Sequence, residues 1–188
     1  MRQAVLLAIA VLIAACATRE VLIPKSGEIP DGLDLSGEWQ LSADTSATNR
    51  ELADAEYEAA GGLEDLLGER RPQRSRRDQR ALVHVFLETG SRLRITQTDA
   101  GLFISFDRAV VEEYRFGEHR PVNVGPVVAE RVSGWEEGNY VVETLDREGG
   151  KLVERYSLEG SDRILVRQIT ILDGDDVETS VAQRFEKL

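Results

Sequence analysis

Residues 140–187 read YVVETLDREGGKLVERYSLEGSDRILVRQITILDGDDVETSVAQRFEK. Four runs of alternating or β-branched residues are separated there by short turns such as Glu148–Gly150 and Asp173–Asp176. Connections this short join antiparallel neighbours. The stretch therefore predicts consecutive hairpins, and similar strand signals recur every eight to twelve residues from Leu93 onward, as in a sandwich or barrel.

Strand signals cover most of the chain after residue 34. A first strand is expected at Gly37–Leu41. The later runs are Leu93–Thr98, Leu102–Asp107, Val110–Phe116, Pro121–Val124, Val127–Trp135, Tyr140–Arg147, Lys151–Glu159, Ile164–Leu172 and Val177–Lys187. An open sheet of this size would expose two edges, whereas closure removes them. We therefore expect a mainly β chain, an antiparallel barrel of about 8–10 strands.

A helical insertion is expected after the first strand, at about residues 45–88. Leu52, Leu63 and Leu66 recur near helical spacing, and Gly61 with Gly62 divides the region into a helix-turn-helix. The run Ala81–Glu88 is ambiguous, because its apolar residues fit both an alternating strand and a helix face. A helix is the expectation there.

The order of these elements carries a family resemblance. Gly37-x-Trp39 on the first strand, a helix-turn-helix and a long meander resemble the calycins, which include the lipocalins and the fatty-acid-binding proteins. The body, residues 34–188, more closely resembles uncharacterised lipocalin-like domains of bacterial secreted proteins. The resemblance implies that Trp39 plugs one barrel end and that Arg184, on the last strand, stacks on its indole or bonds nearby carbonyls.

The first fifteen residues have the features of a secretory signal. Arg2 supplies a positive charge, and an apolar run too short to span a bilayer follows. The sequence Ile13-Ala14-Ala15-Cys16 resembles a bacterial lipobox, which implies an acylated Cys16, and Ala17 after it resembles outer-membrane sorting toward the periplasm. Ordinary cleavage at an A-x-A site and an uncut anchor remain alternatives. Residues 16–33 are expected to form a flexible tether.

Composition excludes several classes of protein. Acidic side chains outnumber basic ones by 34 to 23, for a net charge of −11, which argues against a general nucleic-acid binder. One cysteine and two histidines make a disulfide scaffold or zinc site improbable. His84 and His119 lack partners at triad spacing, and no phosphate-binding loop is present. We expect no catalysis, no metal and no cofactor.

Polar residues on three of the expected strands form one candidate binding site. Arg167 shares a strand face with apolar neighbours, Glu143 and Glu154 lie in facing strands of one hairpin, and Tyr156 shares a face with Glu154. Inside a barrel, these four would resemble the headgroup site of a fatty-acid carrier. Alternatively, the charges point to water and pair across strands, where each pair contributes well under about 1 kcal/mol.

A cluster of arginines forms the second candidate feature. Residues 70–80 contain six arginines and one aspartate. The arginines are Arg70, Arg71, Arg74, Arg76, Arg77 and Arg80. On a membrane-tethered chain they could contact anionic headgroups, at about 1 kcal/mol per residue. Alternatively, they form a solvated linker that folds back on the acidic body.

The sequence thus supports two hypotheses about function. The first is a lipid-anchored envelope protein whose barrel binds a hydrophobic or amphipathic small molecule, with apolar walls around its tail and one arginine or tyrosine at its head. The second is a barrel packed solid, acting as a structural or protein-interaction module. A cavity of a few hundred Å³ would favour the first, and a filled interior the second.

Overall fold

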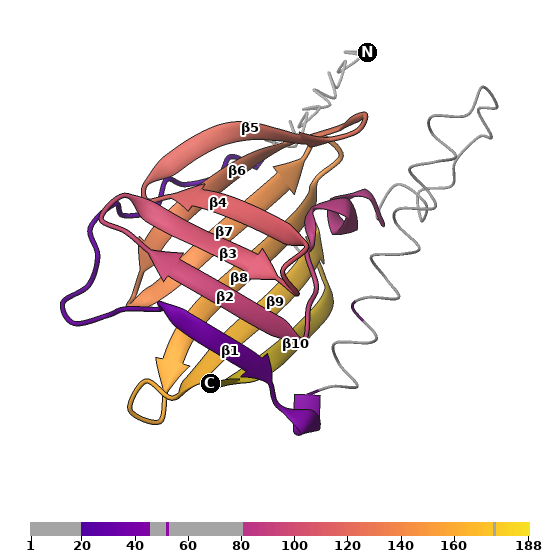
Figure 1. Ribbon diagram of the computed structural model, residues 1–188. Helices are drawn as coiled ribbons and strands as arrows, with labels where there is room; N and C mark the ends of the chain where they lie inside the picture. Colours follow the sequence, from indigo (N-terminus) through magenta and orange to yellow (C-terminus); the bar gives the residue numbers. More distant parts are fainter. Residues whose placement is uncertain (1–19, 46–51, 53–80, 175) are drawn as a thin grey trace, which may run out of the picture.

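The computed structural model describes residues 20–45, 52, 81–174 and 176–188. These residues form ten strands and two short 3-10 helices (Figure 1). In chain order the elements are β1 (Gly37–Leu41), η1 (Ala43–Thr45), η2 (Ala81–Phe86), β2 (Arg92–Gln97), β3 (Gly101–Phe106), β4 (Val110–Arg115), β5 (Glu118–Val124), β6 (Val127–Glu136), β7 (Asn139–Asp146), β8 (Gly150–Glu159), β9 (Ile164–Asp173) and β10 (Asp176–Lys187).

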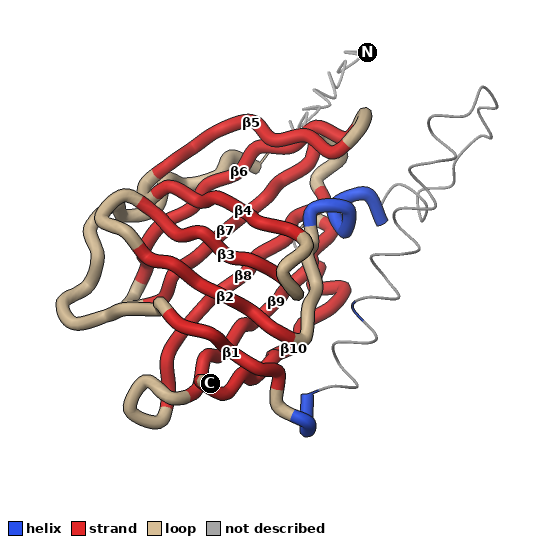
Figure 2. The backbone as a smooth tube through the Cα atoms, in the orientation of Figure 1, coloured by secondary structure: helices blue, strands red, loops and turns tan. Residues whose placement is uncertain are grey.

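Every strand pairs antiparallel with its neighbours, in the order β4-β3-β2-β1-β10-β9-β8-β7-β6-β5. Short turns join most consecutive strands (Figure 2). The two ends of the described body meet where Trp39 on β1 lies opposite Lys187 on β10. The amide of Leu188 also donates to the carbonyl of Glu38 at 2.9 Å. The antiparallel barrel expected from the sequence is therefore confirmed.

The expected helical insertion is described only in part. Residues 46–51 and 53–80 lie outside the described residues, so the helix-turn-helix expected there is not tested. The ambiguous run Ala81–Glu88 contains the 3-10 helix η2. Leu52 is buried and packs with Val83, Phe86 and Leu87 against one end of the barrel. We call this the η2 end.

Alternation along β9 and β10 places side chains inside or outside the barrel. On β9, Leu165, Arg167, Ile169 and Ile171 are all buried, as expected. On β10, Gln183 and Phe185 in the C-terminal half of the strand are also buried. Val177 is 60% exposed, because the register shifts between Val177 and Thr179. A shift of one residue moves a side chain to the other face.

Residues 20–36 lie against the barrel, and we call them the strap. The expectation of a flexible tether through residue 33 is wrong from Glu20 onward. Leu22 is buried against Val132 and Leu145, and the backbone of Ser26 exchanges hydrogen bonds with Trp135 at 3.0 and 2.8 Å. The strap ends at the opposite end of the barrel from η2, where Leu35 is buried beside Trp39. We call this the strap end.

A glycine permits the close approach of the strap. A β-carbon at Gly134 would lie 2.4 Å from the carbonyl oxygen of Ser26 and 2.8 Å from the β-carbon of Lys25. Any larger residue would push the strap away from β6. Neither 3-10 helix, nor any other helical stretch of the described residues, is long and apolar enough to cross a bilayer.

Candidate functional site

Three of the four residues expected at the binding site meet inside the barrel. Arg167, which is 1% exposed, donates from Nε and Nη2 to Oε2 of Glu154 at 2.9 and 2.5 Å. The hydroxyl of Tyr156 donates to the same oxygen at 2.8 Å. Gln183 accepts a longer bond from Nη1 of Arg167, at 3.3 Å. The guanidinium lies 5.0 Å from the ring centre of Phe106.

Charge is balanced within this buried cluster. Burial opposes the charge on Arg167, but the groups around it, with Glu154 foremost, together outweigh burial and keep the pKa of Arg167 above its ordinary value. Burial raises the pKa of Tyr156 well above that of a free phenol, so its hydroxyl stays protonated and donates. Because Glu154 already occupies two donors of Arg167, the cluster stabilises a polar layer of the core rather than presenting a vacant cation.

Glu143, the fourth expected member, lies on the outer face of the barrel. It faces Val153 across the hairpin, whereas Glu154 faces Val142, so the two carboxylates point to opposite sides of the sheet. Outside, Glu143 pairs with Lys25 of the strap at 2.8 Å and with Lys151 at 3.3 Å. The prediction that Glu143 shares a site with Arg167 is therefore wrong.

Aromatic side chains fill the strap end of the barrel. Tyr140 is at the centre of this cluster, with its ring centre 5.3 Å from that of Trp135, 5.5 Å from Phe116 and 6.3 Å from Tyr114. Burial raises the pKa of the Tyr140 hydroxyl. Aromatic pairs at these separations contribute about 0.5–1.5 kcal/mol beyond area burial. This half of the interior is packed rather than hollow.

The expected contact between Trp39 and Arg184 is replaced by another. Trp39 is fully buried, and its indole N–H donates to the carbonyl of Leu35 at 3.1 Å. The ammonium of Lys187 lies 5.0 Å from the indole centre. Arg184 points outward, because its neighbours Gln183 and Phe185 point inward, and it pairs with Glu159 at 2.7 Å. The strand pairing expected from the resemblance is present, but Lys187 supplies the cation.

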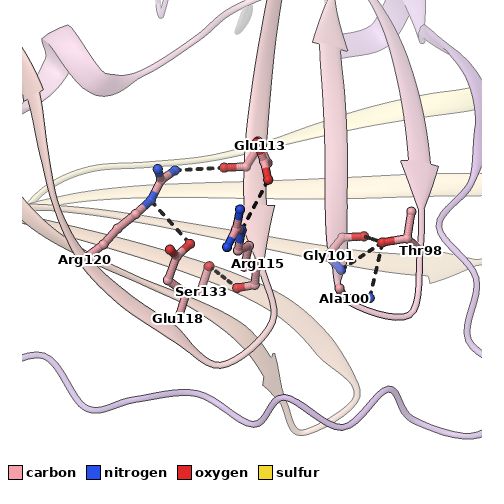
Figure 3. A network of polar contacts seen from close by, with 8 residues as sticks. All are labelled: Thr98, Ala100, Gly101, Glu113, Arg115, Glu118, Arg120 and Ser133. Carbon is pink, nitrogen blue, oxygen red and sulfur yellow. Dashed lines mark hydrogen bonds and ion pairs between the residues drawn. The ribbon is translucent and has the colours of Figure 1, made fainter.

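One interruption breaks the barrel wall. β4 and β5 are the two ends of the strand order, and no backbone ladder joins them within the described part of the chain. We call this gap the seam. Side chains bridge it instead: Arg120 donates to the carbonyl of Glu113 at 2.9 Å, and Ser133 donates to that of Arg115 at 2.7 Å (Figure 3). These bonds satisfy carbonyls that a neighbouring strand would otherwise pair.

A cleft of about 280 Å³ opens on the seam at the η2 end. Its lining residues are Val85, Phe86, Glu88, Glu112, Arg120, Pro121, Val122, Asn123, Val124 and Arg131. Arg131 is 5% exposed, and its guanidinium lies 5.9 Å from the ring centre of Phe86 and 5.6 Å from that of Tyr114. The lining of the cleft is therefore mixed: the buried cation of Arg131 lies among apolar residues such as Phe86 and Val122 and charged residues such as Glu112.

Two hydrogen-bond partners fix the position of Arg131 in the lining of the cleft. Its Nε donates to the hydroxyl of Thr144 at 3.0 Å, and Nη1 donates to Glu112 at 3.1 Å. Burial opposes the charge, but nearby groups, with the carboxylates of Glu112 and Glu154 among them, together outweigh burial and hold the pKa of Arg131 above its ordinary value. Glu112 is partly exposed on the edge strand β4, so an external anion can compete with it.

Sequence reasoning missed Arg131, although its signal resembles that of Arg167. Val127, Ala129 and Arg131 alternate along one strand and point inward together. Phe86 and Glu112 carried no comparable signal, because their roles depend on how η2 and β4 meet β6. Cys16 and all six arginines of residues 70–80 lie outside the described residues. No group of three potential metal ligands occurs among the residues that are described.

Comparisons with known proteins place this geometry in context. No protein-family model matches the sequence, and no curated protein sequence matches it. Among solved structures, the chain aligns with a secretory abundant heat soluble protein from Ramazzottius varieornatus at a TM-score of 0.47 and 11% identity, over 81% of this chain and 94% of that one. A second such protein, number 4, gives 0.45 and 12%, over 82% and 94%.

A luciferase domain from the dinoflagellate Lingulodinium polyedrum gives a TM-score of 0.48 and 14% identity, over 88% of this chain but only 45% of that one. At such scores these likenesses carry no argument about family or function. The fold itself follows from ten antiparallel strands in a nearly closed ring. The described residues form a mainly β, antiparallel barrel.

Proposed function

We propose that this protein binds an amphipathic small molecule with an acidic headgroup at the seam, while anchored in a bacterial envelope through acylated Cys16. The observation that carries the proposal is Arg131, a buried guanidinium that lines a cleft beside the apolar side chains of Val85, Phe86 and Val122. A guanidinium presents a planar set of donors that matches a carboxylate or phosphate. The apolar part of the ligand would contact Phe86, Val85 and Val122.

The size of the cleft limits the ligand. A volume of about 280 Å³ is at the low end for small-molecule sites. The aromatic packing of the strap end leaves no continuation of the cleft through that half of the barrel. The proposed ligand is therefore a compact amphipathic acid, held at the η2 end. The proposal assigns no catalytic residue and no cofactor.

Anchoring and location complete the proposal. The lipobox-like residues 13–16 support acylation of Cys16, and Ala17 supports an outer-membrane protein facing the periplasm. The arginines of residues 70–80 would contact anionic headgroups at the same membrane.

The binding test uses medium-chain fatty acids and the matching alcohols as probes, with titration calorimetry on the full-length protein. Arg131→Gln should weaken binding of the acids about tenfold or more, because a charge-assisted bond contributes about 1.5–3 kcal/mol, and should leave the alcohols unchanged. Arg94→Gln, an exposed arginine on β2, is the control. Val122→Phe should block the cleft while keeping Arg131.

The filled strap end supports a second candidate, a solid barrel that serves as a structural or interaction module. Under that alternative no acid or alcohol in the series would bind, and Arg131→Gln would change only stability. Unfolding measurements on each variant separate loss of binding from loss of folding.

A further inference from the structure

The strap brings the barrel close to its anchor. Cys16 precedes Glu20, the first described residue, by four positions. A chain spans at most about 3.6 Å per residue, so the body begins within about 14 Å of Cys16. We propose that the barrel rests directly on the bilayer, with Val21 and Ile23 of the strap in the membrane interface. This inference rests on the anchor of the proposed function.

The strap's own alternation presents these two side chains outward. Leu22 is 4% exposed and packs on Val132 and Leu145 of the barrel wall. Its neighbours Val21 and Ile23 are 75% and 73% exposed. Alternate residues of an extended segment point to opposite sides, so burial of Leu22 directs both neighbours away from the barrel. Apolar side chains next to a lipid anchor gain by entering the interface.

Some acidic groups on this side of the barrel hold basic partners, although the whole chain carries −11. Glu20 pairs with Lys151 at 2.7 Å. Lys25, further along the strap, lies 2.7 Å from Glu136. Acidic groups that hold basic partners are repelled less by an anionic surface than unpaired ones. This surface therefore tolerates a bilayer better than the net charge suggests.

The shape of the same side also suits a lipid surface. A groove of about 550 Å³ lies between the strap and the barrel wall. Its lining includes Val21, Leu22, Val128 and Leu145 together with charged residues such as Arg147. The β5–β6 hairpin lines both this groove and the seam cleft. A bilayer against the strap would lie beside the mouth of the seam, so an amphipathic ligand could enter from the membrane.

The test uses the mature acylated protein in vesicles of phosphatidylethanolamine and phosphatidylglycerol at a ratio of about three to one, chosen to carry the anionic surface discussed above. Cys16 is the sole cysteine and is blocked when acylated, so Ile23→Cys provides one free thiol for a nitroxide label. Val177→Cys on β10, with its wild-type side chain 60% exposed, is the matched control. Electron paramagnetic resonance then compares accessibility to oxygen and to a water-soluble nickel chelate.

The label at position 23 should show a several-fold higher oxygen-to-nickel accessibility ratio than the label at position 177. A label at Val21→Cys should give the same high ratio, and this variant replaces Ile23→Cys if that protein does not fold. Equal, water-like accessibility in protein that floats with vesicles overturns the inference while leaving the anchor intact. Protein that neither floats nor carries acyl mass overturns the anchor, and the inference with it. Fatty-acid binding, measured separately, is independent of both results.

Discussion

The buried pair of Arg167 and Glu154 gives the sharpest test of how this core is stabilised. Both side chains are about 1% exposed, and two bonds of 2.9 and 2.5 Å join them. Arg167→Met leaves Glu154 buried without its cation, and Glu154→Leu leaves Arg167 without its anion. Removal of one partner from a buried pair costs about 3–5 kcal/mol. In a domain of this size that loss lowers Tm by about 6–20 °C.

The double variant Arg167→Met with Glu154→Leu should recover most of this loss. It leaves no unpaired buried charge, and apolar replacement of a buried pair is often neutral or stabilising. Urea unfolding of the wild type, both single variants and the double variant gives the coupling energy. Single variants that each lose less than about 1 kcal/mol, or a double variant as weak as the sum of the singles, would refute the reasoning.

Three further predictions concern the ends of the barrel. Burial raises the pKa of the Asp146 carboxyl, so the stability that this group contributes at low pH is lost as pH rises through the raised value. The stability of Asp146→Asn relative to wild type should therefore increase between pH 4 and pH 7.5 in thermal unfolding measurements. A stability difference that stays constant with pH would contradict this prediction. Gly134→Ala should lower the free energy of unfolding by about 1–3 kcal/mol and remove hydrogen-exchange protection from the amide of Ser26, because the new β-carbon displaces the strap. Retained protection of that amide would show that the strap tolerates the added methyl group. Lys187→Met should lower the free energy of unfolding by about 0.5–1 kcal/mol and change the fluorescence emission of Trp39, measured in a Trp135→Phe background. An equal change in emission in Arg184→Met would instead support the contact between Arg184 and Trp39 that the resemblance implied.

Much of the barrel could be predicted from local patterns. Short turns between alternating runs specify antiparallel neighbours, and Arg167 could be recognised as a charged residue on an apolar strand face. Such signals depend only on residues close in sequence. They are therefore readable without knowledge of the pairing between distant strands.

Register decided where sequence reasoning went wrong. Glu143 and Glu154 do lie in one hairpin, but their positions differ in parity, and each faces a valine of the other strand. The prediction that Arg184 contacts Trp39 was wrong for the same reason, because Arg184 alternates with inward-facing neighbours while Lys187 lies opposite Trp39. The prediction of a flexible tether was wrong because Leu22 is buried against Val132 and Leu145, which lie more than a hundred residues away in the sequence.

The seam could not be predicted either. The turn between β4 and β5 is short, which in most sequences indicates a hairpin. Here the two strands diverge, and side chains such as Arg120 and Ser133 replace the ladder. The separation of β4 from β5 depends on how far the other eight strands bend around the core. The bending is set by the whole barrel, so a local sequence pattern does not show it.

The pairing of β1 with β10 also has a consequence for biosynthesis. Residues Asp176–Lys187 leave the ribosome after the other nine described strands, and they contribute both the partner of β1 and the partner of β9. Until they emerge, the nascent polypeptide has no means of joining its two halves. Closure of the ring between β1 and β9 is thus delayed until β10 has been synthesised, and before that point the inner faces of both halves are open to water.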